Sequence, residues 1–192
     1  SALTCDHVTF VGNKAIWGGG IGVGGGELYA NDCVFSENQA ETWGGGVAGD
    51  FATLHLNHCA FEQNGSGWGS GGLHMDHATA MITDCAFSGN NAVFGGGFHA
   101  VYSQITSAHS EFLNNQTEAG GGVHIEDSDC VFEQCSFQEN KALNGTGGAI
   151  DFYADSTIFD RSYLLKVEGC SFTENSASVH SGAVRIEQSA SD

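Results

Sequence analysis

Short stretches in which apolar and polar residues alternate recur along the whole chain. Leu54 and Leu56 illustrate the pattern: apolar side chains stand two residues apart, and mostly polar residues fall between them. Apolar residues with a period of two predict a β-strand that buries one face. The i, i+3, i+4 spacing of an amphipathic helix is absent and glycine is frequent, so the pattern argues against an α-solenoid.

The alternating stretches belong to one repeated segment of about 25 residues. Each copy has a phenylalanine, an asparagine three residues later, a small residue two positions further on, and then Gly-Gly or Ser-Gly followed by an apolar residue. The phenylalanines are Phe10, Phe35, Phe61, Phe87, Phe112, Phe137 and Phe172. The asparagines are Asn13, Asn38, Asn64, Asn90, Asn115, Asn140 and Asn175. Repeats of this length are typical of solenoids.

These copies predict an all-β fold, a right-handed parallel β-helix of about seven rungs with three short strands per rung. One strand is expected around the Leu-x-Leu positions, one around Cys-x-Phe and one after Gly-Gly. Such short strands cannot bury a face alone, but stacked copies can, because each strand pairs with its counterpart about 4.8 Å away. The repeated asparagine is expected to form an interior ladder in which each side-chain amide bonds the next.

Composition narrows the class of protein. The 192 residues include 29 glycines and no proline, which excludes collagen. We therefore expect the glycines to lie in tight corners of the chain. The net charge of −18 makes nucleic acids and anionic membranes poor partners. The chain lacks an apolar run long enough for membrane insertion. We expect residues 1–192 to form a single β-helix domain, an internal segment of a longer protein, with an insertion loop at 151–163 in the sixth rung.

The repeat resembles a known family at two sets of residues. Phe137-Gln138-Glu139-Asn140 and Gly147-Gly148-Ala149-Ile150 resemble the Phe-x-x-Asn and Gly-Gly-Ala-Ile motifs of chlamydial polymorphic membrane proteins. The resemblance covers nearly the whole chain. It implies the β-helical passenger region of a surface-exposed, secreted, adhesin-like protein, and therefore an extracellular or cell-surface location.

Four aromatic residues occupy equivalent places in consecutive copies. Trp17, Trp43 and Phe94 stand four residues before the apolar residue that follows Gly-Gly, and Trp68 stands five before. They should form one column along the N-terminal half of the rod. Their corner position and glycine neighbours favour partial exposure, so the column is a candidate surface for a partner chain or a glycan. Ring stacking that supports the corner is the structural alternative.

A histidine column is the candidate metal site. His74, His99 and His124 each follow the apolar residue after Gly-Gly, which predicts an outward stack on three successive rungs. Imidazoles are common ligands of zinc and copper, so a divalent cation is the one cofactor that the sequence suggests. An exposed stack without metal is the alternative.

Two other features carry candidate chemistry. Of the three glycosylation sequons, only that of Asn144 lies in a turn, since the other two use ladder asparagines. Five of the seven cysteines share one column, where parallel Cβ vectors disfavour disulfides and favour buried free thiols.

These features favour a non-enzymatic extracellular structural or adhesive module, a rigid acidic rod in a larger surface or filament assembly. Its expected partners are neighbouring chains or further rungs at the uncapped ends, and glycans. The alternative is a carbohydrate-active β-helix enzyme, of polysaccharide lyase or glycosidase type, or a carbohydrate-binding protein. The chain has only five Lys and Arg residues, and we expect no outward column with carboxylates on consecutive rungs. No catalytic residue is therefore assigned.

Overall fold

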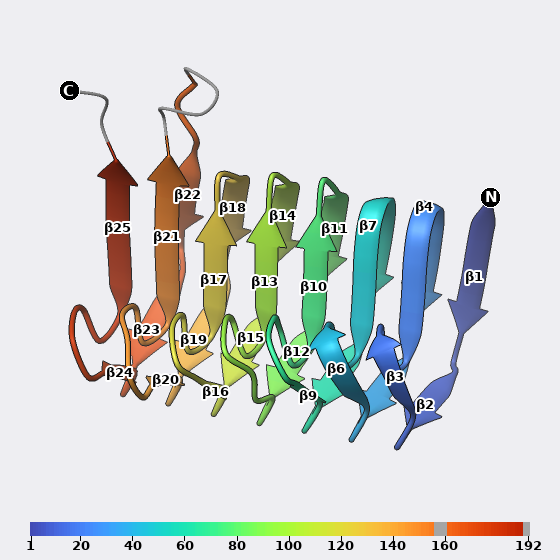
Figure 1. The fold of residues 1–192 in the computed structure, drawn as a ribbon. Coiled ribbons are helices and arrows are strands. Elements are labelled where there is room, and N and C mark those ends of the chain that lie inside the picture. The colour runs from blue at the N-terminus through green and yellow to red at the C-terminus, as the bar shows by residue number, and fades with distance from the viewer. Residues whose placement is uncertain (156–160, 190–192) are drawn as a thin grey trace.

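The chain folds into a parallel β-helix whose strands stack side by side from the N-terminus at one end to the C-terminus at the other (Figure 1). The structure is a computed structural model that describes residues 1–155 and 161–189. The seven copies of the repeat make about six turns of an all-β solenoid, one fewer than the predicted count. The predicted fold class is confirmed.

One ladder runs through the repeated phenylalanines. Within it every strand pairs in parallel with the equivalent strand of the next copy, phenylalanine against phenylalanine. Its strands are β2 (Thr9–Val11), β5 (Val34–Ser36), β8 (Ala60–Glu62), β12 (Ala86–Ser88), β15 (Glu111–Leu113), β19 (Ser136–Gln138) and β23 (Ser171–Thr173).

The other two predicted ladders also form. The Leu-x-Leu positions lie on β1 (Ala2–Asp6), β11 (Thr79–Thr83), β14 (Gln104–Ala108), β18 (Asp129–Glu133) and β22 (Leu165–Glu168). The segments after Gly-Gly lie on β10 (Leu73–Asp76), β13 (Phe98–Val101), β17 (Val123–Glu126), β21 (Ile150–Asp155) and β25 (Val184–Ser189). In the second and third turns the two ladders merge, because β4 (Ile21–Asn31) and β7 (Val47–Asn57) stay paired through the corner between them.

A fourth, shorter ladder follows the repeated asparagine and was not predicted. It comprises β3 (Lys14–Trp17), β6 (Gln39–Trp43) and β9 (Gly65–Ser66), then β16 (Gln116–Thr117), β20 (Lys141–Ala142) and β24 (Ser176–Ala177). These strands are mostly two residues long, too short for an alternating pattern to reveal them.

The core is a continuous stack of phenylalanine rings beside a ladder of asparagine amides. Neighbouring rings lie parallel with centroids 4.7–5.0 Å apart, as in Phe61 and Phe87 at 4.7 Å and Phe87 and Phe112 at 5.0 Å. In the ladder, Nδ2 of Asn64 donates to Oδ1 of Asn90 at 3.0 Å. The central ladder asparagines are buried, as predicted.

Glycine permits the close approach of successive turns. A Cβ at Gly72 would lie 2.3 Å from the carbonyl oxygen of Gly97 on the next turn. Gly44 has a φ of 66°, in the left-handed region that favours glycine. The Gly-Gly motif is therefore where the backbones of adjacent turns pack most tightly.

The first residues of the predicted insertion loop, 151–155, belong to a strand. Residues 151–155 continue strand β21, so the extra residues follow this strand. All five pair with β25, and residues 151–153 also pair with β17. Residues 156–160 of the predicted loop lie outside the described residues. Among the residues that are described, no helix is long and apolar enough to cross a membrane.

Candidate functional site

The candidate site lies on the outer side of β10, β13 and β17. Leu73 and Met75 point into the core, so His74 between them points the opposite way. The backbone register aligns His74 with His99 and His99 with His124 on adjacent strands. The predicted histidine column is thus present, and each of its histidines directly follows the apolar residue after Gly-Gly.

The aromatic column and the histidine column line a single groove of about 490 Å³. Its walls combine aromatic rings, imidazoles and carboxylates. The lining residues are Trp17, Trp43, Asp50, Trp68, His74, Asp76, Phe94, His99, Val101 and Glu126. All four aromatic residues singled out from the sequence therefore belong to the same site as two of the three histidines.

Two of the four rings lean over a histidine of the following turn. Trp43 stacks on His74 with centroids 4.6 Å apart, and Phe94 stacks on His124 at 5.1 Å. Trp17 lies over Gly22, whose missing Cβ leaves room for the indole. Trp68 is the most open of the four, with 59% of its surface exposed, whereas the other three are half-buried.

The histidines are consequently buried, and the alternative of an exposed stack is wrong. His99 is only 2% exposed, and His74 and His124 are similarly covered. The strand pattern correctly gave their outward direction, but it could not show that the aromatic corner of the preceding turn folds over them.

Two carboxylates stand on consecutive turns of the neighbouring outward column, contrary to expectation. Asp50 and Asp76 pair directly on consecutive turns, and Val101 separates them from Glu126 in the same column. Asp50 went unnoticed because it lies in the corner of the merged strand β7, where the repeat is less regular. Three acidic side chains therefore line one side of the groove.

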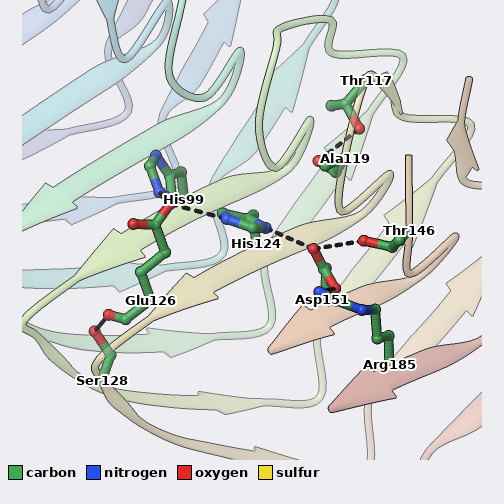
Figure 2. A network of polar contacts seen from close by, with 9 residues as sticks. All are labelled: His99, Thr117, Ala119, His124, Glu126, Ser128, Thr146, Asp151 and Arg185. Carbon is green, nitrogen blue, oxygen red and sulfur yellow. Dashed lines mark hydrogen bonds and ion pairs between the residues drawn. The ribbon is translucent and has the colours of Figure 1, made fainter. Parts of the chain in front are cut away.

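Glu126 joins the two later histidines at the C-terminal end of the groove. Its Oε1 atom lies 2.9 Å from Nε2 of His124 and 3.3 Å from Nε2 of His99 (Figure 2). One donor atom from each of these three residues lies within 4.8 Å of the others. His74 is not part of this convergence, since it stacks on Trp43 and is tilted against His99.

A second carboxylate holds the far side of His124. Oδ2 of Asp151 lies 3.1 Å from Nδ1 of His124 and accepts a hydrogen bond from the Thr146 hydroxyl at 3.0 Å. Its other oxygen accepts from Arg185 at 2.9 Å. Figure 2 shows Glu126, His124 and Asp151 in a row, with Thr146 and Arg185 against Asp151.

These contacts shift the ionisation of the buried groups. Burial would lower the pKa of His124, but hydrogen bonding to Asp151 and Glu126 outweighs it and raises the pKa above the usual value. For His99, burial prevails over the attraction of Glu126 and lowers the pKa. Burial, followed by the neighbouring His99, holds the pKa of His74 well below its usual range.

The carboxylates shift in the complementary direction. The hydrogen bond with His124 and the nearby imidazole of His99 lower the pKa of Glu126. Burial opposes ionisation of Asp151, but His124 and Arg185 prevail and lower its pKa. Both carboxylates are therefore held as anions at neutral pH, each beside an imidazole.

The remaining predicted residues lie apart from the groove. Asn144 is exposed in the segment after β20, so its sequon stays a candidate for glycosylation, while Asn64 and Asn115 are buried. All seven cysteines are free, and only Cys170 is not buried.

Comparison with known proteins identifies the architecture. A family model described as "Right handed beta helix region" matches residues 1–191. Neither a curated protein nor a solved structure matches the chain. The match spans almost the whole sequence and agrees with the parallel ladders described above. The chain therefore belongs to the right-handed β-helix family.

Proposed function

We propose that the chain is a non-enzymatic extracellular adhesive module that binds glycans in the aromatic groove. The observation that carries this proposal is the alignment of Trp17, Trp43, Trp68 and Phe94 along one wall of the groove, opposite three carboxylates. A sugar ring has an apolar C–H face that packs on an aromatic ring and hydroxyls that donate to carboxylates. The groove offers both kinds of contact along successive turns.

The exposed indole and an unpartnered carboxylate oxygen support binding of an extended ligand. Trp68 presents a large apolar surface to solvent at the mouth of the groove. Oδ1 of Asp50 is buried and has no hydrogen-bond partner among the described residues. A buried unpaired acceptor is unfavourable, and a sugar hydroxyl would satisfy it. The spacing of the turns, about 4.8 Å, lets one chain of sugars contact several rings.

The charge of the groove selects among glycans. Asp50, Asp76 and Glu126 line it, and none of its described lining residues is Lys or Arg. Together with the net charge of −18, this repels sulfated and uronic acid polysaccharides. We therefore expect neutral or amino-bearing glycans to bind and acidic ones to be rejected.

The repeats support the extracellular part of the proposal. Their Phe-x-x-Asn and Gly-Gly-Ala-Ile motifs resemble those of the polymorphic membrane proteins, which implies an adhesin-like passenger segment at a cell surface. In that setting further rungs or neighbouring chains would pair with the strands at the two ends of the rod. The groove would remain accessible on its side.

Binding of soluble oligosaccharides to the full chain tests this function. Tryptophan fluorescence is titrated with a panel of neutral, amino-bearing and uronic acid oligosaccharides. We expect saturable changes with the first two classes, and at least a tenfold loss of affinity, about 1.4 kcal/mol, in Trp68→Ala.

Phe51→Ala is the matched control, because Phe51 is 66% exposed yet does not line the groove. Equal losses in the two variants, or the absence of binding across the panel, would contradict the proposal.

A glycosidase is the second candidate, favoured by the pairing of Asp50 and Asp76 on consecutive turns in the same groove. Glycoside hydrolysis uses two carboxylates, one as acid and one as base or nucleophile. Release of reducing sugar from the oligosaccharides that bind, and its loss in Asp76→Asn, would favour this enzyme over a binding module. A polysaccharide lyase fits less well, since it would act on uronic acid polymers that the acidic groove repels.

A further inference from the structure

We propose that His99, His124 and Glu126 form a binding site for a divalent transition-metal ion, with Zn²⁺ as the best fit. The site lies at the C-terminal end of the groove, on strands β13 and β17. It differs from the histidine column expected from the sequence, because Glu126 takes the place of His74.

The spacing of the donor atoms matches a tetrahedral ion. Ligands about 2.0–2.1 Å from zinc lie roughly 3.3 Å from one another in that geometry. Oε1 of Glu126 lies 2.9 Å from Nε2 of His124 and 3.3 Å from Nε2 of His99. All three residues have a donor atom within 4.8 Å of the other two. An ion between these atoms would need only small side-chain movements.

The buried state of His99 is the second observation that points to a ligand. The side chain is 3% exposed, and neither ring nitrogen makes a hydrogen bond of good geometry with the protein, although Nε2 is near Glu126. An unpaired buried nitrogen is unfavourable, because it has lost its hydrogen bonds to water. Coordination of Nε2 to an ion would satisfy that nitrogen and orient the ring.

The surroundings of His124 resemble the outer shell of known metal sites. A metal-binding imidazole usually gives its other N–H to a carboxylate, which fixes the ring and strengthens it as a ligand. Asp151 occupies that position, 3.1 Å from Nδ1, and is itself held by Thr146 and Arg185. His124 lies on β17, Asp151 on β21 and Arg185 on β25, so three successive turns contribute to this arrangement.

The donor set selects the kind of ion. Two imidazoles and one carboxylate suit zinc, copper, nickel or iron, whereas calcium and magnesium prefer oxygen ligands. Three protein ligands leave a fourth position open. His99 and Glu126 also line the groove, so the open position faces the space in which a ligand would lie. This inference stands on the histidine cluster alone and does not depend on glycan binding.

Calorimetric titration of the chelator-treated full chain with Zn²⁺ tests the site. We expect saturable binding of one ion, and a Co²⁺-loaded sample should show the strong visible absorption of tetrahedral cobalt. His99→Gln and Glu126→Gln should abolish both signals. Asp151→Asn should weaken binding about 10–100-fold, as expected for an outer-shell carboxylate.

His58→Gln provides the matched control, because His58 lies 3.7 Å from Asp84 in an exposed pair that could bind zinc weakly. It should leave the affinity unchanged. Circular dichroism would establish that each variant is folded, and the cobalt spectrum of the wild type tests the site without any variant. Absence of saturable binding, a spectrum of octahedral cobalt only, or loss of binding in His58→Gln would overturn the proposal.

Discussion

Removal of one central ladder asparagine should destabilise the whole solenoid. Asn90 makes four hydrogen bonds through its side chain, all buried. Its Oδ1 accepts from the backbone N–H and from Nδ2 of Asn64, both at 3.0 Å. Its Nδ2 donates to the carbonyl of Phe61 at 2.9 Å and to Oδ1 of Asn115 at 3.0 Å.

The magnitude follows from the groups that Asn90→Ala leaves behind. Oδ1 of Asn115 keeps a second donor, the backbone N–H of Asn90, and so stays paired. The backbone N–H of Asn64 and one of its two amide hydrogens lose their acceptor. Each unsatisfied buried donor costs about 1–3 kcal/mol, so we expect a loss of about 2–6 kcal/mol in the free energy of unfolding.

Urea unfolding followed by circular dichroism measures this loss, and the ladder supplies its own control. Asn13 stands at the exposed N-terminal end and donates to Asn38, but no described asparagine donates to it. Asn13→Ala should therefore cost less than about 1 kcal/mol. Terminal turns of a solenoid can also unfold separately, which makes the central position the informative one. Equal effects of the two substitutions would refute the ladder as a source of stability.

Two further pairs of residues should respond differently, one pair to substitution by alanine and the other to alkylation. Gly72→Ala should destabilise by about 1–3 kcal/mol in the same urea assay, because its Cβ would meet the Gly97 carbonyl, whereas Gly24→Ala meets nothing within 4 Å and should be neutral or slightly stabilising. Alkylation followed by mass spectrometry should modify Cys170 first and leave Cys130 intact. Raising the pH from 7 to 9 should not change this order, since burial raises the pKa of the Cys130 thiol well above its usual value and keeps it protonated. Modification of Cys130 as fast as Cys170 at either pH would contradict its burial.

The amino-acid sequence by itself determined the architecture. A strand places alternate side chains on opposite faces, so residues two apart identify the buried face without any knowledge of the fold. The fixed spacing of Phe and Asn then requires equivalent residues to stack, as Phe61 and Phe87 do. The same periodicity gave the outward direction of His99 and placed it beside His124. The two-residue strands of the fourth ladder were missed because they are shorter than one full alternation.

Only the tertiary structure decided what the outward residues form together. The position of a residue along the repeat does not determine toward which neighbouring turn its side chain points. Trp43 stacks on His74 of the next turn, and this contact brings the aromatic column and the histidine column together in one groove. Burial of the histidines followed from that stacking. Asp151 reached His124 because the sixth copy continues its strand through this residue, although the sequence there suggested a loop. Such contacts depend on side-chain direction and on the course of neighbouring turns, which a pattern of single residues does not specify.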